Sequence, residues 1–243
     1  MILGNFCCLR MASRRRKEEH MKKIVIIWFG LVLFAWALGI ASEKDFEIQG
    51  KKLISQKPSF IMSLPSEFRL IHFSSRANPS EGSLTRAYYF VKAKEKDVQE
   101  MLIVEIADRT NPQAGPITTP ALKPFTEKRM YLKDRMKRGE FRGNYLIQLM
   151  AWNPDAPSLQ PVVRKGIMIP SGWALQGQFL FVYQGENAVF IRYTKNVNSF
   201  GLKISEEGKD WERESISGNE KKAYETFQKT FMEMIDSIQI KNP

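Results

Sequence analysis

Basic side chains are concentrated in one short part of this chain, between residues 128 and 138. Cations at this density can bind phosphate or carboxylate groups, on a lipid surface or on an acidic polymer. The candidate binding residues are Lys128, Lys133, Arg135, Lys137 and Arg138.

The spacing of the apolar residues around these cations predicts how they are presented. Phe125, Leu132 and Met136 recur at near-helical intervals, and Pro124 suits a first turn, so we expect a helix over about 121–138. A basic amphipathic helix can lie on anionic lipid. Alternatively, the cations form the solvated face of a helix that docks on a sheet.

Two proline-rich loops are further candidates. The segment 108–124 holds four prolines and is unusually long for an internal connection, and the segment 152–161 holds three. Proline lowers the entropic cost of fixing a loop against a partner. Their candidate binding residues are Asp108, Arg109, Asn111 and Trp152. The alternative is that both segments simply cross between layers of the fold.

The residues needed for catalysis are scarce after Ser42. His72 is the one histidine there, and its place in an apolar run indicates a packed or edge residue and not a catalytic base. There is no Gly-x-Ser-x-Gly elbow, and zinc sites built from Cys and His are excluded. Glu105 and Asp108, with Glu100 upstream, are the candidate acids of a hydrolase. We therefore expect no enzyme, no cofactor and no metal, with a carboxylate-dependent hydrolase as the alternative.

Composition narrows the class of partner. The whole chain has 37 Lys and Arg against 26 Asp and Glu, a net charge of +11, and residues 42–243 keep 30 and 24 of these, or +6. Such a mildly basic surface favours anionic lipids or envelope polymers, and it does not suggest nucleic acid. Both cysteines, Cys7 and Cys8, precede residue 42, so no disulfide is expected beyond it.

Short apolar runs dominate residues 42–243 and predict a sheet. The predicted strands are 59–64, 68–74, 85–92, 98–107, 143–152, 162–169, 177–184 and 187–195. The last two, separated by Gly185-Glu186, indicate an antiparallel hairpin. Both alternating faces of 143–152 and 179–183 are largely apolar, so both faces of the sheet must be covered, by helices or by a second sheet.

One helix is well marked at the carboxyl end. Ser217 and Glu220 have the spacing of a capping box, and apolar residues then recur every three or four positions up to Ile238. A short strand over Ser237–Ile240 can follow it. The fold class we expect is α+β, a mainly antiparallel sheet with helices on both faces, in one domain over 42–243.

Two sequence patterns also resemble a known family. The chain reads Phe60-Ile61-Met62-Ser63-Leu64-Pro65-Ser66-Glu67-Phe68 near the start of the domain, and its terminal helix ends in a Phe-x-x-Met-Ile-x-Ser-Ile pattern, Phe231 to Ile238. Over about residues 45–240 this is similar to PsbP-like domains. The resemblance implies an α/β/α sandwich and a non-enzymatic accessory or assembly role at a membrane surface.

The amino-terminal part predicts the location. Eighteen uncharged residues, Ile24–Ala41, follow a basic stretch, which is typical of a signal peptide or a membrane anchor over 21–41. Gly39 and Ala41 suit cleavage after Ala41, whereas the length suits an anchor. Residues 1–20 read as a disordered or spurious extension. Both alternatives place the domain outside the cytoplasm, periplasmic or secreted.

The expected function is therefore non-catalytic binding, or an accessory role in assembly, close to the membrane. The expected partner is an envelope protein, an anionic membrane surface or an anionic polymer. The alternatives are the hydrolase of envelope polymers and a passive structural subunit of an envelope complex.

Overall fold

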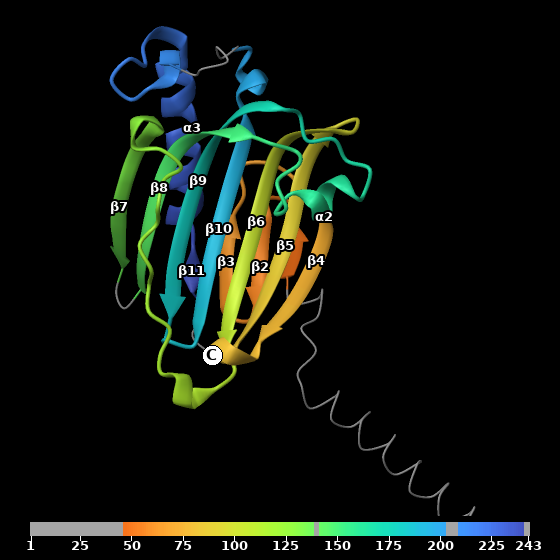
Figure 1. Ribbon diagram of the computed structural model, residues 1–243, viewed down its shortest axis with the longest axis vertical. Coiled ribbons are helices and arrows are strands. Elements are labelled where there is room, and N and C mark those ends of the chain that lie inside the picture. Colours follow the sequence, from red (N-terminus) through yellow and green to blue (C-terminus); the bar gives the residue numbers. More distant parts are fainter. Residues whose placement is uncertain (1–45, 139–140, 203–208, 241–243) are drawn as a thin grey trace, which may run out of the picture. The chain divides into compact units, whose positions relative to one another are not determined.

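Two antiparallel sheets form the framework of the protein (Figure 1). The structure is a computed structural model that describes residues 46–138, 141–202 and 209–240. The larger sheet has seven strands in the spatial order β4-β5-β6-β10-β9-β8-β7, and the smaller has four, in the order β1-β2-β3-β11. Every neighbouring pair is antiparallel.

The bounds of the elements follow the chain. The larger sheet consists of β4 (Arg69–Asn78), β5 (Ser83–Lys94), β6 (Asp97–Arg109), β7 (Met130–Arg138), β8 (Phe141–Trp152), β9 (Gly172–Tyr183) and β10 (Asn187–Asn196). The smaller sheet consists of β1 (Phe46–Gln49), β2 (Lys52–Gln56), β3 (Ser59–Ser63) and β11 (Gln239–Ile240). The helical elements are η2 (Pro79–Glu81), η3 (Pro112–Ala114), η4 (Glu127–Arg129), α2 (Gln160–Val163), η5 (Val197–Phe200), η6 (Lys209–Trp211) and α3 (Gly218–Asp236).

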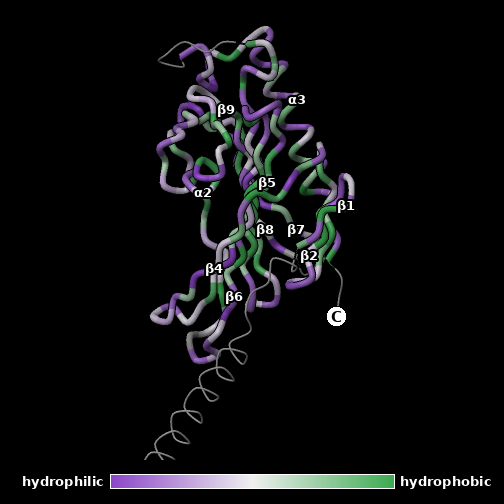
Figure 2. The backbone as a smooth tube through the Cα atoms, turned by 90° about the vertical axis from the view of Figure 1, so that its right-hand side faces the viewer, coloured by the Kyte–Doolittle hydropathy of each residue, from purple (hydrophilic) through white to green (hydrophobic). Residues whose placement is uncertain are grey.

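One face of the larger sheet, here called the inner face, is covered by the smaller sheet and α3. Figure 2 shows β1, β2 and α3 on this side and α2 on the opposite side. Aromatic rings join the layers: Phe46 lies 4.2 Å from Tyr88 between ring centroids, and Phe227 of α3 stacks on Tyr193 at 5.2 Å. These rings belong to one continuous apolar core that includes residues of both sheets and of α3.

A glycine lets α3 approach the sheet closely. Gly177 lies in the middle of β9, and a Cβ atom there would come within 2.4 Å of the ring of Phe231. Phe231 is fully buried. The missing side chain at position 177 is therefore the space that the Phe231 ring fills.

Irregular segments cover much of the opposite face, here called the outer face. At one end, side chains from the segment after β8, among them Leu159, Val162 and Ile167, pack on Tyr89 and Ile103 of the sheet. Elsewhere, Leu122 packs on Leu146 and Leu180. The proline-rich segment after β6 thus lies along the outer face as an extended cover.

The expected fold class is wrong in its layers. The strands are antiparallel, but helices do not cover both faces, and the α/β/α sandwich implied by the resemblance is not what the structure shows. A second sheet shares the inner face with α3, and loops with the four-residue α2 cover the outer face. Apolar strand faces require cover, but their composition does not say whether a helix, a sheet or a loop supplies it.

Several individual elements are confirmed. The hairpin of β9 and β10 turns at Gln184–Glu186, and Phe181 pairs with Val189. The terminal helix forms as α3, although Ser217 makes no side-chain capping bond, and the short strand after it forms as β11. The predicted strand 162–169 is wrong, because α2 and turns occupy it, and sequence analysis missed β1, β2 and β7.

The predicted signal or anchor, residues 21–41, and the extension before it lie outside the described residues. Glu43–Pro243 forms one compact unit. Within the part of the chain that the structure describes, no helix is both long and apolar enough to cross a membrane.

Candidate functional site

The basic residues around position 133 lie on a strand, not on the helix that we expected over 121–138. That segment is an extended loop, the single turn η4, and the strand β7. The apolar positions Leu132 and Met136 fit a period of two as well as a helical one. Because side chains alternate across a strand, Lys133, Arg135 and Lys137 project from the same face of β7.

A second strand adds to this row. On β8, Arg142 pairs with Lys137, Asn144 with Arg135 and Leu146 with Lys133. Leu146 packs under Leu122 on the outer face, so the row of cations lies on that face too. Four basic side chains from two strands therefore share one surface: Lys133, Arg135, Lys137 and Arg142.

A groove runs between these cations and the proline-rich cover, and we call it the basic groove. It consists of two adjoining pockets of about 320 and 510 Å³, which share Arg135 and Asn144. Thr119, Ala121 and Leu122 line its other wall. Two contacts hold this wall: Asn144 Nδ2 donates to the carbonyl of Pro120 at 2.9 Å, and the N–H of Ile117 donates to Gly185 at 2.8 Å.

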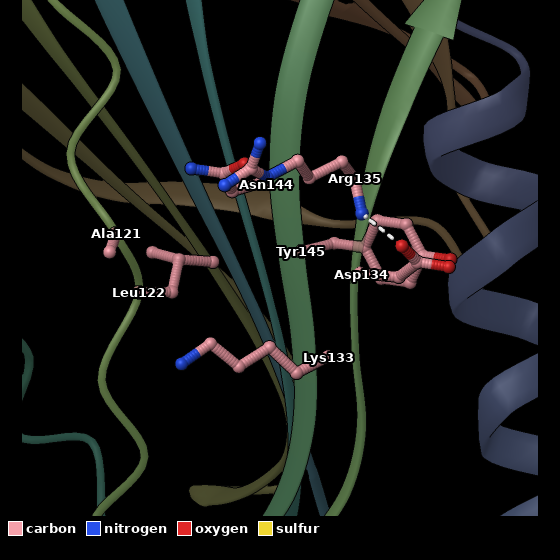
Figure 3. A pocket seen from close by; sticks show the side chains of 7 residues that line it. All are labelled: Ala121, Leu122, Lys133, Asp134, Arg135, Asn144 and Tyr145. Atoms are coloured by element: carbon pink, nitrogen blue, oxygen red, sulfur yellow. Dashed lines mark hydrogen bonds between the residues drawn. The ribbon is translucent and has the colours of Figure 1, made fainter.

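The charged side chains that point into the groove are basic. Figure 3 shows Lys133, Arg135 and Asn144 directed toward the Ala121–Leu122 segment, while Asp134 and Tyr145 point to the other side of the sheet. Asp134 is the one acid among the described residues that line the two pockets. None of the four cations forms an ion pair with a described residue. Within the ranges that the structure describes, the groove thus presents positive charge that no carboxylate neutralises.

The two remaining basic candidates lie apart from this row. Lys128 is on η4, with its side chain 74% exposed and its Nζ 3.8 Å from a carboxylate oxygen of Glu212. Arg138 is the last residue of β7, and its side chain lies outside the described part.

The candidates at the start of the first proline-rich loop make internal contacts. Asp108 is buried on the inner face, where it pairs with Arg86 and accepts a hydrogen bond from Asn187. Arg109 forms an ion pair with Glu186 of the hairpin turn. Asn111 is exposed and accepts a hydrogen bond from the N–H of Gln113 at 3.0 Å, which caps η3. These contacts fix the ends of the loop.

Trp152, the candidate in the second proline-rich loop, is 2% exposed. It ends β8 and belongs to the apolar cluster beneath α2. Its role in the structure is to anchor the cover of the outer face.

The two acids of the alternative hydrolase do not meet. Glu105 and Asp108 are three residues apart on β6, so their side chains leave opposite faces of the sheet. Glu105 forms an ion pair with Arg192 on the outer face, and Asp108 pairs with Arg86 on the inner face. A pair of carboxylates that acts on one glycosidic bond must face the same substrate.

Glu100 lies in a buried polar cluster on the inner face. Burial raises the pKa of its carboxyl, but the hydroxyl of Tyr193, which donates to it at 2.8 Å, and the ammonium groups of Lys195 and Lys92 lower the pKa more. Ser66 also donates to it. Burial and the adjacent carboxylate in turn raise the pKa of Tyr193. Glu100 is therefore a charged, fully partnered carboxylate, well suited to holding the layers together.

His72 lies on β4, 5.6 Å from the ring of Tyr89. Burial and the charge of Lys165 lower its pKa, so the imidazole is neutral near pH 7. A bulge between Leu70 and His72 shifts the register here, which the assumed regular alternation did not anticipate.

Sequence analysis missed Arg142, Asn144 and the wall residues Thr119 to Leu122. A signal for the strand that carries the other three cations was present: in 130–138 Lys133, Arg135 and Lys137 alternate with other residues, as on a strand face. The pairing of Arg142 with this row depends on the register between β7 and β8 and has no local signal.

No three His, Cys, Asp or Glu side chains gather as a metal site anywhere in the described ranges. Comparison with known proteins gives no relative: no family model, no curated protein and no solved structure matches this chain.

Proposed function

We propose that this protein is a non-catalytic binding domain that acts outside the cytoplasm, close to the membrane, and holds anionic groups in its basic groove. The observation that carries the proposal is the convergence of Lys133, Arg135, Lys137 and Arg142 on one concave surface, where none of them pairs with a described carboxylate. Such a surface attracts phosphate or carboxylate groups, because hydrogen bonds between charged groups are stronger than those between neutral groups and because the clustered cations act together on one anion.

Protection of the sheet edge does not account for this arrangement. Exposed lysines on an edge strand discourage pairing with other chains, and β7 is an edge strand. Arg142, however, projects from β8, which is paired on both sides. The covering loop also turns the row of cations into one wall of a groove, a form that edge protection does not require.

The location follows from the sequence. The apolar run Ile24–Ala41, behind a basic stretch, would direct residues 42–243 across the cytoplasmic membrane. Anionic lipids and phosphate-bearing polymers are the kinds of anion that such a basic surface would meet beside a membrane. The separation of Glu105 from Asp108 onto opposite faces supports binding over the alternative of hydrolysis.

The proposal can be tested with a soluble polyanion. We expect the purified protein to bind fluorescently labelled long-chain polyphosphate, measured by anisotropy, with an affinity that falls as salt is added. The variant K133E/R135E/K137E should bind at least about 100-fold more weakly, since each cation beside an anionic surface contributes about 1 kcal/mol. The residual binding should depend less on salt.

A matched control changes the same charge elsewhere. Lys51, Lys52 and Lys57 are exposed around β2 of the smaller sheet, away from the groove. The variant K51E/K52E/K57E should keep most of the affinity. Equal losses in both variants would mean that net charge alone drives binding, and undiminished binding by the groove variant would refute the proposal.

A further inference from the structure

One aromatic ring is exposed beside the basic groove. Phe125 is 71% exposed, and with Met168 it is one of two large apolar residues that the described part of the protein leaves exposed. Lys123 and Lys128, near it in sequence, are exposed cations, and Glu127 between them is an exposed acid. An apolar ring held in water costs free energy unless a partner covers it.

The backbone that carries this ring is fixed from below. The N–H of Phe125 donates to Oε1 of Gln148 at 2.8 Å, and Gln148 is fully buried. Gln148 in turn donates to Gln176 at 3.2 Å, and Gln176 donates to Thr194 at 3.3 Å. A chain of buried amides thus positions the residue.

A second contact holds the turn after Phe125. The N–H of Arg213 donates to the carbonyl of Lys128 at 2.8 Å, which ties η4 to the segment before α3. The ring is therefore displayed on a backbone that is already ordered. Binding through such a residue loses little conformational entropy.

The backbone of Phe125 lies at one end of the row of cations. Alternate residues of β8 on the outer face are Gln148, Leu146, Asn144 and Arg142; Phe125 bonds to the first of them, and the others pair with the three cations of β7. At about 3.3 Å per residue these four positions of β8 extend over roughly 20 Å. The backbone N–H of Phe125 lies at the Gln148 end of the row.

We propose that this row is a membrane-docking surface, in which Phe125 enters the interface of an anionic phospholipid bilayer while the groove cations contact lipid phosphates. This inference rests on the proposed function and names its partner. Aromatic rings favour the headgroup region of a bilayer, and clustered Lys and Arg near it are attracted by anionic lipid. A soluble polyanion would use the cations but has no apolar phase for the ring.

The amino-terminal run bears on the nearness of a bilayer but does not select the outer face, because β1, which follows it, lies on the inner face against Tyr88. Four residues, 42–45, separate Ala41 from the first strand. An uncleaved run would leave the domain within about 15 Å of the bilayer at full extension. Weak contacts with the lipid surface are then strengthened by the high local concentration of the domain.

The test uses Glu43–Pro243, which lacks the apolar run and is one compact unit with its own core; circular dichroism of this segment must first show a folded, strand-rich protein. Partition into vesicles of phosphatidylglycerol and phosphatidylcholine is measured by sedimentation. F125S should weaken partition about tenfold, the loss expected when an aromatic anchor leaves the interface. Binding of labelled polyphosphate by F125S should stay within about twofold of the original value, because the four groove cations remain.

Two further variants make the result specific. M168S removes the other exposed apolar side chain and should leave vesicle partition unchanged. F125W should retain partition, and brominated phosphatidylglycerol should quench its emission more than that of the unchanged protein, which places the ring in lipid. Circular dichroism shows whether each variant is folded.

The outcomes separate the two proposals. Equal vesicle partition by F125S and the unchanged protein would overturn the membrane-docking surface, even if the groove variant still loses polyphosphate. A parallel loss of polyphosphate and vesicle binding by F125S would assign the ring to a polymer and also overturn it. Failure of the groove variant to lose polyphosphate would instead refute the proposed function.

Discussion

The guanidinium of Arg86 and the carboxylate of Asp108 form a two-point ion pair on the inner face of the larger sheet. The distances are 2.8 Å from Nε to Oδ2 and 2.9 Å from Nη2 to Oδ1. Arg86 Nη2 also donates to the carbonyl of Lys57 at 2.8 Å, which lies between β2 and β3. One buried cation thus connects the two sheets, and its carboxylate partner keeps its charge balanced.

Removing one member of this pair should be strongly destabilising. D108A removes the carboxylate that both Nε and Nη2 of the buried Arg86 contact, and we expect a loss of about 3–5 kcal/mol in the free energy of unfolding, measured in urea. R86M/D108L replaces both charges by apolar groups and should recover much of that loss. The more exposed pair Arg109–Glu186 is the control: E186A should cost at most about 1 kcal/mol. A cost for D108A as small as that would contradict the structural role of the pair.

The contact between Gly177 and Phe231 gives a second prediction. G177A introduces a Cβ atom where the ring of Phe231 lies, so α3 must shift or the ring must turn. We expect a loss of about 1–3 kcal/mol by chemical denaturation. In G177A/F231A the crowding is relieved, so the two effects should sum to more than the double variant loses. Additive losses would show that the two positions do not touch.

The Glu100 cluster predicts a dependence of stability on pH. The pKa of Glu100 is below the ordinary value of 4.5 in the folded protein, so its contribution is present above that value and is lost as pH falls through the folded pKa. The unchanged protein should be more stable than E100Q at pH 6, and this difference in the free energy of unfolding should shrink as the pH is lowered to 3. Denaturation midpoints at several pH values measure this. A constant difference between the two proteins over that range would contradict the assignment.

The buried amide chain beneath Phe125 gives a fourth prediction, on local order. Q148L removes the acceptor of the Phe125 N–H, so that amide should exchange with deuterium faster than in the unchanged protein. Q160L is the matched control, because Gln160 bonds to the carbonyl of Pro154 in the other cover of the outer face. It should leave exchange at Phe125 unaltered. Unchanged exchange in Q148L would mean that the loop is held by other contacts.

Strand period and helix period are local properties, and for this reason much of the secondary structure was accessible from sequence. The hairpin of β9 and β10 followed from two apolar runs around Gly185, and α3 followed from its three- and four-residue spacing. The helix predicted over 121–138 was wrong. Phe125, Leu132 and Met136 fit a helical spacing, but residues 130–138 form the strand β7, whose side chains alternate with a period of two.

The sequence by itself determined that this chain has apolar strands needing cover on both faces, a cysteine-free domain and a local excess of cations. Only the tertiary structure decided what covers each face, and that Arg142 joins Lys133, Arg135 and Lys137 beside an exposed Phe125. The physical reason is the distance in sequence between the residues that come into contact. Periodicity reports a residue's own strand or helix, whereas the groove depends on the register between two strands and on a loop folded back over them.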